Sequence, residues 1–307
     1  MGRYARVVNI AFVVVALGVA ALTIKHFLTH GWPLHDADPI GVAIAGGLFL
    51  AAYAFKAWGW AHLFREDERP HSLTLAAAGG AASVGGVALP GRFDEAIRIA
   101  VVRKLPGKRA GLGAIVISLL VLGWIDSAAL TPLASIAAAA ADKGSVQTGF
   151  ALLAGIGVIA AGAVVALPLL ARTLLRRFRI SQWMREHCAC ARAASTAWVL
   201  VSVSWALRGT AVFVLLHALA VGASFPLALA FLCASAASAA LPIAPAGAAT
   251  QAGAGTAILA VSGVSTAQAV AFAVAAQALV IVAGAACVVA AGVWHAGLRL
   301  VQAPRPA

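Results

Sequence analysis

Charged residues are scarce in this chain. Lys, Arg, Asp and Glu make up only 10% of its 307 residues, whereas 63% are hydrophobic and the mean hydropathy is +0.97. A soluble globule needs more charge to keep its surface in water, so the composition indicates an integral membrane protein. The apolar runs also lack the period-two alternation that a membrane β-barrel requires. We therefore expect an all-α membrane protein with one membrane domain over residues 1–307.

Cysteine is scarce too, and the common catalytic motifs are missing. Cys233 and Cys287 fall in apolar runs while Cys188 and Cys190 lie on a basic loop, so no disulfide is expected. His187 adjoins the basic pair, but no second pair of ligands lies nearby in sequence, so we expect neither a metal site nor a cofactor. There is also no His-Glu-x-x-His zinc helix and no Gly-x-Ser-x-Gly turn.

Apolar runs of helix length predict six transmembrane helices, at 7–28, 39–60, 109–131, 148–171, 195–221 and 266–294. The first run follows Arg3 and Arg6 as in a signal peptide, but it exceeds the usual core of about 7 to 15 residues. Two weaker segments, 72–98 and 225–264, are dense in Gly, Ala, Ser and Pro. They are predicted to be broken or re-entrant hairpins. The alternative is that they are ordinary, slightly short helices whose prolines mark loop boundaries.

Basic residues predict the orientation. The net charge of +12 comes from Lys and Arg in short loops beside apolar runs, which indicates membrane topology and anionic headgroups rather than nucleic acid. These clusters fall on one side of the predicted spans, so that side and both termini are expected to be cytoplasmic. We expect a multi-pass protein of the plasma (inner) membrane of a bacterial envelope. The basic segment 172–192 interleaves apolar residues and is typical of an interfacial amphipathic helix.

The predicted elements repeat. Residues 1–140 and 141–307 each give two spans, a hairpin and one span, and the odd number of crossings in the first half inverts the second. The two hairpin tips could then meet near the bilayer centre, where alternating access would expose a binding site to either side.

Each hairpin carries a proline-marked interruption. Pro90 and Gly91 break the first, and Pro242, Pro245 and Gly247 break the second. Proline frees backbone groups, which are tolerated at membrane depth only within protein or beside a wet cavity. Close helix packing is predicted at the small residues Gly79, Gly80, Gly85, Gly86, Gly247, Gly253 and Gly255.

Charged residues follow the first interruption. Arg92, Asp94, Glu95 and Arg98 place both signs within seven positions, and on a helix Arg98 neighbours both Asp94 and Glu95. Arginine suits phosphate because its planar fork donates two parallel hydrogen bonds. The alternative is a solvated cytoplasmic loop.

Other polar residues fall inside the predicted spans. Lys56 is expected to snorkel to the cytoplasmic edge. Asp126 and Arg208 lie deeper, so each is expected to have a partner inside the bundle, as structural glue or as part of a pathway. Gln277 is also placed within a span.

The pattern Pro90-Gly91-Arg92-x-x-Glu95-x-x-Arg98, followed by a helix with Asp126, resembles the flippase-like membrane domain of lysylphosphatidylglycerol synthases. The proline-rich stretch from Pro242 to Gln251 resembles the second motif of that family. The family usually has glycine where Asp94 stands, glutamate where Gln251 stands, and a charged pair in place of Leu122 and Gly123. The resemblance covers nearly the whole chain, without the soluble synthase domain. It implies movement of an anionic lipid, such as a modified phosphatidylglycerol or a polyprenyl-phosphate glycolipid.

Three functions are therefore considered. The first is lipid flipping, with the headgroup bound by Arg92, Asp94, Glu95, Arg98, Asp126, Arg208 and Gln251. The second is a polyprenyl-phosphate-dependent glycosyltransferase, because His35, Asp36 and Asp38 lie just outside the first span, where such enzymes place acidic residues. The third is a non-catalytic partner of a lipid-modifying enzyme. We expect a transporter rather than an enzyme.

Overall fold

The computed structural model describes residues 37–88, 93–105, 110–141, 144–172, 191–222, 224–240 and 247–302, together with Lys25 and Thr29. These ranges contain nine helices and no strand: α2 (Pro39–Ala61), α3 (Ser72–Ala88), α4 (Phe93–Lys104), α5 (Leu112–Ala140), α6 (Ser145–Arg172), α8 (Ala191–Ala218), α9 (Phe225–Ala240), α10 (Gly247–Val261) and α11 (Thr266–Gln302). The prediction of an all-α protein is confirmed.

Five of the described helices are long and apolar enough to cross a membrane. They include Pro39–Ala61, Leu112–Ala140, Ser145–Ala166, Arg192–Ala218 and Thr266–Leu298. Each matches one predicted span. The sixth prediction, 7–28, and most of the basic segment 172–192 lie outside the described residues.

Local chemistry sets where two of these helices begin and end. Asp38 caps the N-terminus of α2, because its carboxylate accepts hydrogen bonds of 3.0 Å from the backbone N–H groups of Ile40 and Gly41, and Pro39 stands at the first helical position. The sequence prediction ended the third span at Thr131, before Pro132, but α5 continues to Ala140. Proline inside a membrane helix is tolerated, and α5 continues through Pro132 for about two further turns.

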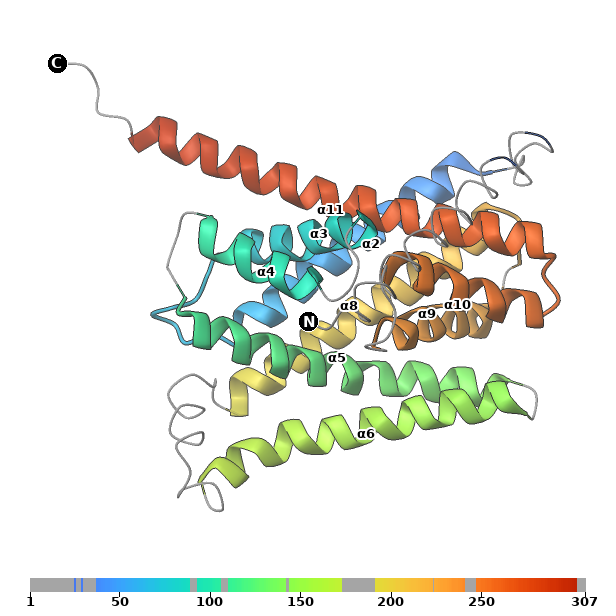
Figure 1. The fold of residues 1–307 in the computed structure, drawn as a ribbon, viewed down its shortest axis with the longest axis horizontal. Coiled ribbons are helices and arrows are strands. Elements are labelled where there is room, and N and C mark those ends of the chain that lie inside the picture. Colours follow the sequence, from blue (N-terminus) through green and yellow to red (C-terminus); the bar gives the residue numbers. More distant parts are fainter. Residues whose placement is uncertain are drawn as a thin grey trace, which may run out of the picture.

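The two weaker segments each form a pair of packed helices. α3 packs against α4, and α9 packs against α10. Figure 1 shows the first pair in the left half of the molecule and the second in the right half, between α11 and α5. These four helices have 17, 12, 16 and 15 residues, fewer than the roughly 20 needed for a full crossing.

Long helices enclose the two pairs. α2 and α8 pack along each other, α5 packs on α6, and α11 contacts α2, α3 and α10. α2 approaches α8 closely at Gly59, where an added Cβ would lie 2.9 Å from the Val201 side chain. Large fully buried side chains such as Phe272, Leu215 and Leu229 fill the interior. The core is therefore shared by helices from both halves of the chain.

The predicted glycine contacts are confirmed in part. Gly80 of α3 meets the backbone of Gly284 in α11, Gly85 faces Ile97, and Gly255 lies under the ring of Phe231. Gly79 only touches Tyr53, whereas Gly86 and Gly253 have open space where a Cβ would stand, so the prediction of tight packing is wrong there. Gly247 begins α10. The pattern of small residues marks which helices can approach, but the partner helix decides which glycine is used.

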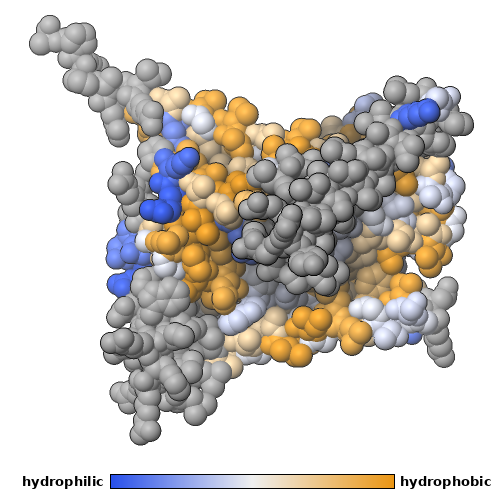
Figure 2. All heavy atoms as spheres, viewed as in Figure 1, coloured by the Kyte–Doolittle hydropathy of each residue, from blue (hydrophilic) through white to orange (hydrophobic). Residues whose placement is uncertain are grey.

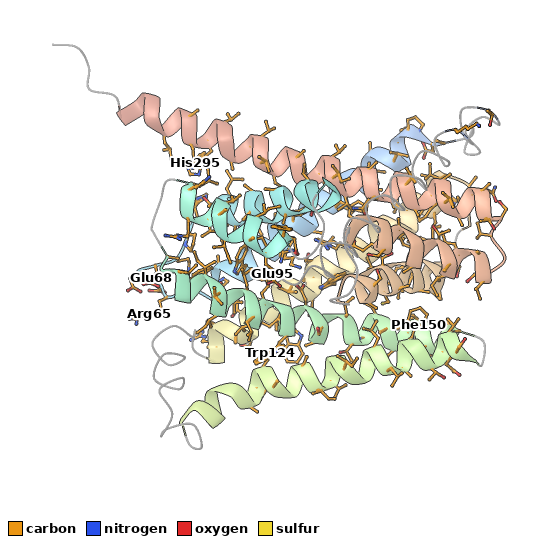
Figure 3. The ribbon with its side chains drawn as sticks, in the orientation of Figure 1. Arg65, Glu68, Glu95, Trp124, Phe150 and His295 are labelled. Carbon is orange, nitrogen blue, oxygen red and sulfur yellow. The ribbon has the colours of Figure 1, made fainter. Side chains whose placement is uncertain are left out.

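On the described surface in Figure 2, polar residues gather near the helix ends and apolar residues lie between them. Figure 2 shows hydrophobic residues over much of the described surface on this face, with the most hydrophilic residues toward the left and the upper right. The left end includes Arg65 and Glu68 of the connection between α2 and α3, which Figure 3 labels. An apolar band between polar ends is the surface that a bilayer requires.

Candidate functional site

An ion pair inside the bundle joins α2 to α5. Lys56 Nζ lies 2.7 Å from Asp126 Oδ2 and 2.9 Å from Asp126 Oδ1, and the two side chains are only 19% and 20% exposed. The expectation that Lys56 snorkels is therefore wrong. A lysine in an apolar helix can lower its desolvation penalty in two ways, by reaching water or by meeting an anion, and here Asp126 is within reach.

Trp205 of α8 completes this cluster. Its indole N–H donates to Asp126 Oδ1 at 2.8 Å, and Lys56 Nζ lies 5.6 Å from its ring centroid. The carboxylate thus accepts hydrogen bonds from two different helices, so its lone pairs are largely used within the protein. The same three helices are fastened nearby, because the Trp60 indole N–H donates to Ser118 Oγ at 2.9 Å and Ser204 Oγ to the Ala52 carbonyl at 2.7 Å.

Arg208 lies one turn after Trp205, on the same face of α8. Its guanidinium carbon is 5.1 Å from the ring centroid of Trp205 and 5.5 Å from that of Tyr53, in the range of cation–π attraction. The Tyr53 ring is fixed in turn, because its hydroxyl donates to Ser83 Oγ at 2.6 Å. No carboxylate of the described residues lies within ion-pair distance of Arg208. This cation is therefore held by aromatic faces, and no carboxylate in the described part of the chain pairs with it.

Arg208 opens onto a cavity of about 90 Å³ among α2, α8, α9, α10 and α11. That volume has room for several water molecules. Its polar lining comes from Trp205, Arg208, Ser235, Gln251 and Gln277, and apolar side chains such as Phe49, Val212 and Phe231 form the rest. The Ser235 hydroxyl donates to the backbone carbonyl of Gln251 at 3.1 Å and ties α9 to α10 beside the cavity.

Three of the predicted site residues come together here. Arg208 and Gln251 line the same cavity, and Asp126 is connected to it through Trp205. Asp126 and Arg208 were expected to have partners inside the bundle, and both have them. Gln277, placed within a span from sequence, also lines the cavity.

The charged residues of α4 lie apart from the cavity lining. Arg98 Nη2 is 3.7 Å from Asp94 Oδ2, which is the pairing expected from their spacing. Glu95 is exposed, and among the described residues no ion pair links it to Arg98, so that expected pairing is not seen. Figure 3 places Glu95 well inward from the end that holds Arg65 and Glu68. Arg98 is also close enough to Lys56 for their charges to repel.

Some of the predicted residues are not among those that the structure describes. Pro90, Gly91, Arg92, Pro242 and Pro245 lie outside the described residues, as do His35 and Asp36. Asp38 is described, and its carboxylate caps α2 while its backbone N–H donates to the Ala218 carbonyl at 2.8 Å.

Sequence reasoning missed Trp205 and Tyr53. A signal was present, because Trp205 precedes Arg208 by three positions and Tyr53 precedes Lys56 by three, in two apolar helices. Such spacing puts an aromatic ring and a cation on one helix face. Among the described residues, no three His, Cys, Asp or Glu side chains come together as metal ligands would.

The family model described as "Lysylphosphatidylglycerol synthase TM region" matches residues 6–287. The suspected resemblance is thus confirmed. No curated protein and no solved structure matched the chain.

Proposed function

Because the chain belongs to the family of the lysylphosphatidylglycerol synthase TM region, we propose that it moves an anionic lipid between the two leaflets. The headgroup enters the cavity beside Arg208, and the hydrocarbon chains stay in the bilayer. Membership in this family supports a lipid-related role in the membrane. The chemistry of the cavity supports the anionic headgroup.

The observation that carries the proposal is the Arg208 guanidinium, which faces a cavity between apolar helices and has no ion-pair partner among the residues that the structure describes. An arginine at the centre of a membrane helix costs roughly 2.5 to 3.5 kcal/mol on insertion scales, so such a residue usually has a counter-charge or a function. A phosphate would supply the missing charge and accept two parallel hydrogen bonds from the fork. Gln251 and Gln277 add amide donors and acceptors to the same cavity.

We further propose that the two halves are inverted repeats over residues 1–140 and 141–307. Helix neighbours match in pairs: α2 packs on α3 as α8 packs on α9, and α11 packs on α2 and α3 as α5 packs on α8 and α9. The short pairs α3/α4 and α9/α10 then act as re-entrant hairpins from opposite sides. Contact between α3 and α10 supports tips that meet inside the protein. Alternating access follows from rocking one half against the other.

The proposed orientation places the basic end in the cytoplasm of a bacterial plasma membrane, with both termini on that side. Arg103 and Lys104 lie in the last turn of α4, and Arg192 lies in the first turn of α8. Those helix ends are on the left in Figure 1, the side on which Figure 3 labels Arg65. A positive excess at one end favours that end as cytoplasmic.

A transporter fits these contacts better than a glycosyltransferase. The enzyme hypothesis needs acidic groups free to bind substrate or metal beside the second span, but the Asp38 carboxylate is occupied as a helix cap. The third hypothesis, a partner subunit of a lipid-modifying enzyme, requires no lipid movement by the chain alone. Activity of the purified chain therefore separates it from a flippase.

The test is lipid flipping in proteoliposomes that contain only this chain. Acyl-labelled phosphatidylglycerol is reconstituted, and exposure of the label to a membrane-impermeant quencher is followed in time. We expect Arg208→Ala to slow flipping by roughly 10- to 100-fold, the effect of losing charge-assisted hydrogen bonds worth about 1.5 to 3 kcal/mol. Arg208→Lys should recover part of the rate, because it keeps the charge but loses the fork.

The matched control is Arg192→Ala, which removes an exposed arginine from the same helix, roughly 24 Å away along α8. It should flip at the native rate. Equal slowing by both variants, or native flipping by Arg208→Ala, would contradict the proposed headgroup site. Absence of flipping by the native chain alone would favour the partner-subunit hypothesis.

A further inference from the structure

The cavity lining combines apolar side chains with five polar ones, and none of the lining side chains is acidic. Its polar members are one cation, two amides, one hydroxyl and one indole, and no Asp or Glu of the described residues lines it. Asp126 is linked to the cavity through Trp205, and its carboxylate already accepts hydrogen bonds from Lys56 and Trp205. Asp94 is engaged with Arg98 on α4.

The charges around the cavity therefore leave an excess of positive charge. Lys56 is matched by Asp126, and Arg98 is matched by Asp94, whereas Arg208 has no carboxylate partner among the described residues. Exposed Glu95 is not part of the lining. An anionic phosphodiester completes this arrangement. An ammonium group on the headgroup would be repelled by Arg208, and no carboxylate of the cavity lining would pair with it.

Apart from Arg208, the polar side chains of the cavity lining are neutral. The side-chain amides of Gln251 and Gln277 each offer donors and acceptors, and Ser235 adds a hydroxyl. These groups match the hydroxyls of glycerol or a sugar, which need both donors and acceptors. They provide no charge for an ammonium group.

We propose that the site selects phosphodiester headgroups whose substituent is uncharged and carries hydroxyls, such as glycerol or a sugar, and discriminates against headgroups that carry an amino group. This inference rests on the proposed function, because it specifies the substrate class of the same cavity. Gln251 is the selecting residue. It gives the headgroup a neutral amide at a position where a carboxylate would accept an ammonium.

The experiment compares lipids with identical acyl labels in proteoliposomes of the native chain. The probes are phosphatidylglycerol, a glycosylated phosphatidylglycerol, lysyl-phosphatidylglycerol and phosphatidylethanolamine. We expect the first two to flip at least about tenfold faster than the two amino lipids, the discrimination expected from one uncompensated charge. The variant Gln251→Glu should raise the rate of lysyl-phosphatidylglycerol relative to phosphatidylglycerol by about tenfold or more.

Two further variants make this result specific. Gln251→Ala removes the amide without adding charge, so it should slow all four lipids without favouring the amino lipids. Gln277→Glu adds a carboxylate from a different helix of the same cavity and should shift the preference in the direction of Gln251→Glu. Elution of each variant as a single species in size-exclusion chromatography establishes that it is folded.

The outcomes distinguish the inference from the proposed function. Equal rates for all four lipids, or faster movement of the amino lipids by the native chain, overturn the inference and leave lipid flipping intact. An unchanged preference in both glutamate variants overturns it as well. No movement of any lipid contradicts the proposed function itself. Efflux of entrapped glycerol 3-phosphate as fast as lipid flipping would assign the same chemistry to a soluble phosphate and overturn the lipid substrate.

Discussion

Removing either member of the Lys56–Asp126 pair should destabilise the protein more than removing both. At 2.7 Å and an effective dielectric constant of about 20, the attraction is about 6 kcal/mol before desolvation is subtracted. Breaking a buried pair on one side typically costs about 3 to 5 kcal/mol. Because both side chains are about one-fifth exposed, we expect about 2 kcal/mol for Lys56→Met and about 2 kcal/mol for Asp126→Asn.

The double variant leaves no uncompensated charge, so we expect it to lose only about 1 kcal/mol. The coupling energy of the cycle is then about 3 kcal/mol. The measurement is the free energy of unfolding in mixed micelles titrated with sodium dodecyl sulfate, followed by far-UV circular dichroism and tryptophan fluorescence.

The control cycle uses Arg65 and Asp67, whose side chains are 57% and 69% exposed at a distance of 3.5 Å. Its coupling energy should stay below about 0.5 kcal/mol, as for other surface pairs. If the Lys56–Asp126 cycle is additive within about 0.3 kcal/mol, the two groups do not form the ion pair that joins α2 to α5.

Three other changes test the packing, the carboxylate cluster and the cavity. Gly80→Val should lower the free energy of unfolding by about 1 to 3 kcal/mol, because the new side chain forces α3 away from the backbone of α11. The control Gly86→Val, on the same helix, should lower it by less than about 0.5 kcal/mol. Equal losses in the two variants would contradict the contact between α3 and α11. Trp205→Phe keeps a ring beside the guanidinium but removes the indole N–H, so it should lower the free energy of unfolding by about 1 to 2 kcal/mol in the same titration. An unchanged free energy would mean that the hydrogen bond to the Asp126 carboxylate does not contribute to stability. In a background without native cysteines, Ser235→Cys should react with a polar thiol reagent, because its thiol lines the cavity. Ile156→Cys should not react, because its thiol lies on an exposed apolar face of α6. Equal reactivity of the two variants would argue against a hydrated cavity.

Much of the fold could be predicted from composition and run length. Apolar runs of about 20 residues have few alternatives in a membrane, so the spans at 39–60, 148–171, 195–221 and 266–294 agree with α2, α6, α8 and α11 to within a few residues at most ends. The C-terminal ends of α5 and α11 were harder to predict, because both helices run beyond the predicted spans. α5 passes Pro132 because the membrane favours a continuous helix over free backbone groups.

The site was predicted less well because its contacts are between helices. Nothing in the sequence pairs Lys56 with Asp126, which are 70 positions apart. A lysine near the end of an apolar run is compatible with snorkelling and with an internal partner, and only the packing of α2 against α5 and α8 decides between them. Arg208 and Gln251 were identified singly as polar residues in an apolar setting. Their place on one cavity depends on how α8 and α10 pack around α9.

The long helix α11 connects the two short helix pairs mechanically. It touches α3 through facing glycines, where the backbones meet without intervening side chains, and it packs on α10 farther along its length. A stiff rod held at two points along its length acts as a lever. Under the proposed alternating access, a tilt that lifts α11 from one pair would press it against the other, so the movements of the two pairs would be coupled in opposite directions.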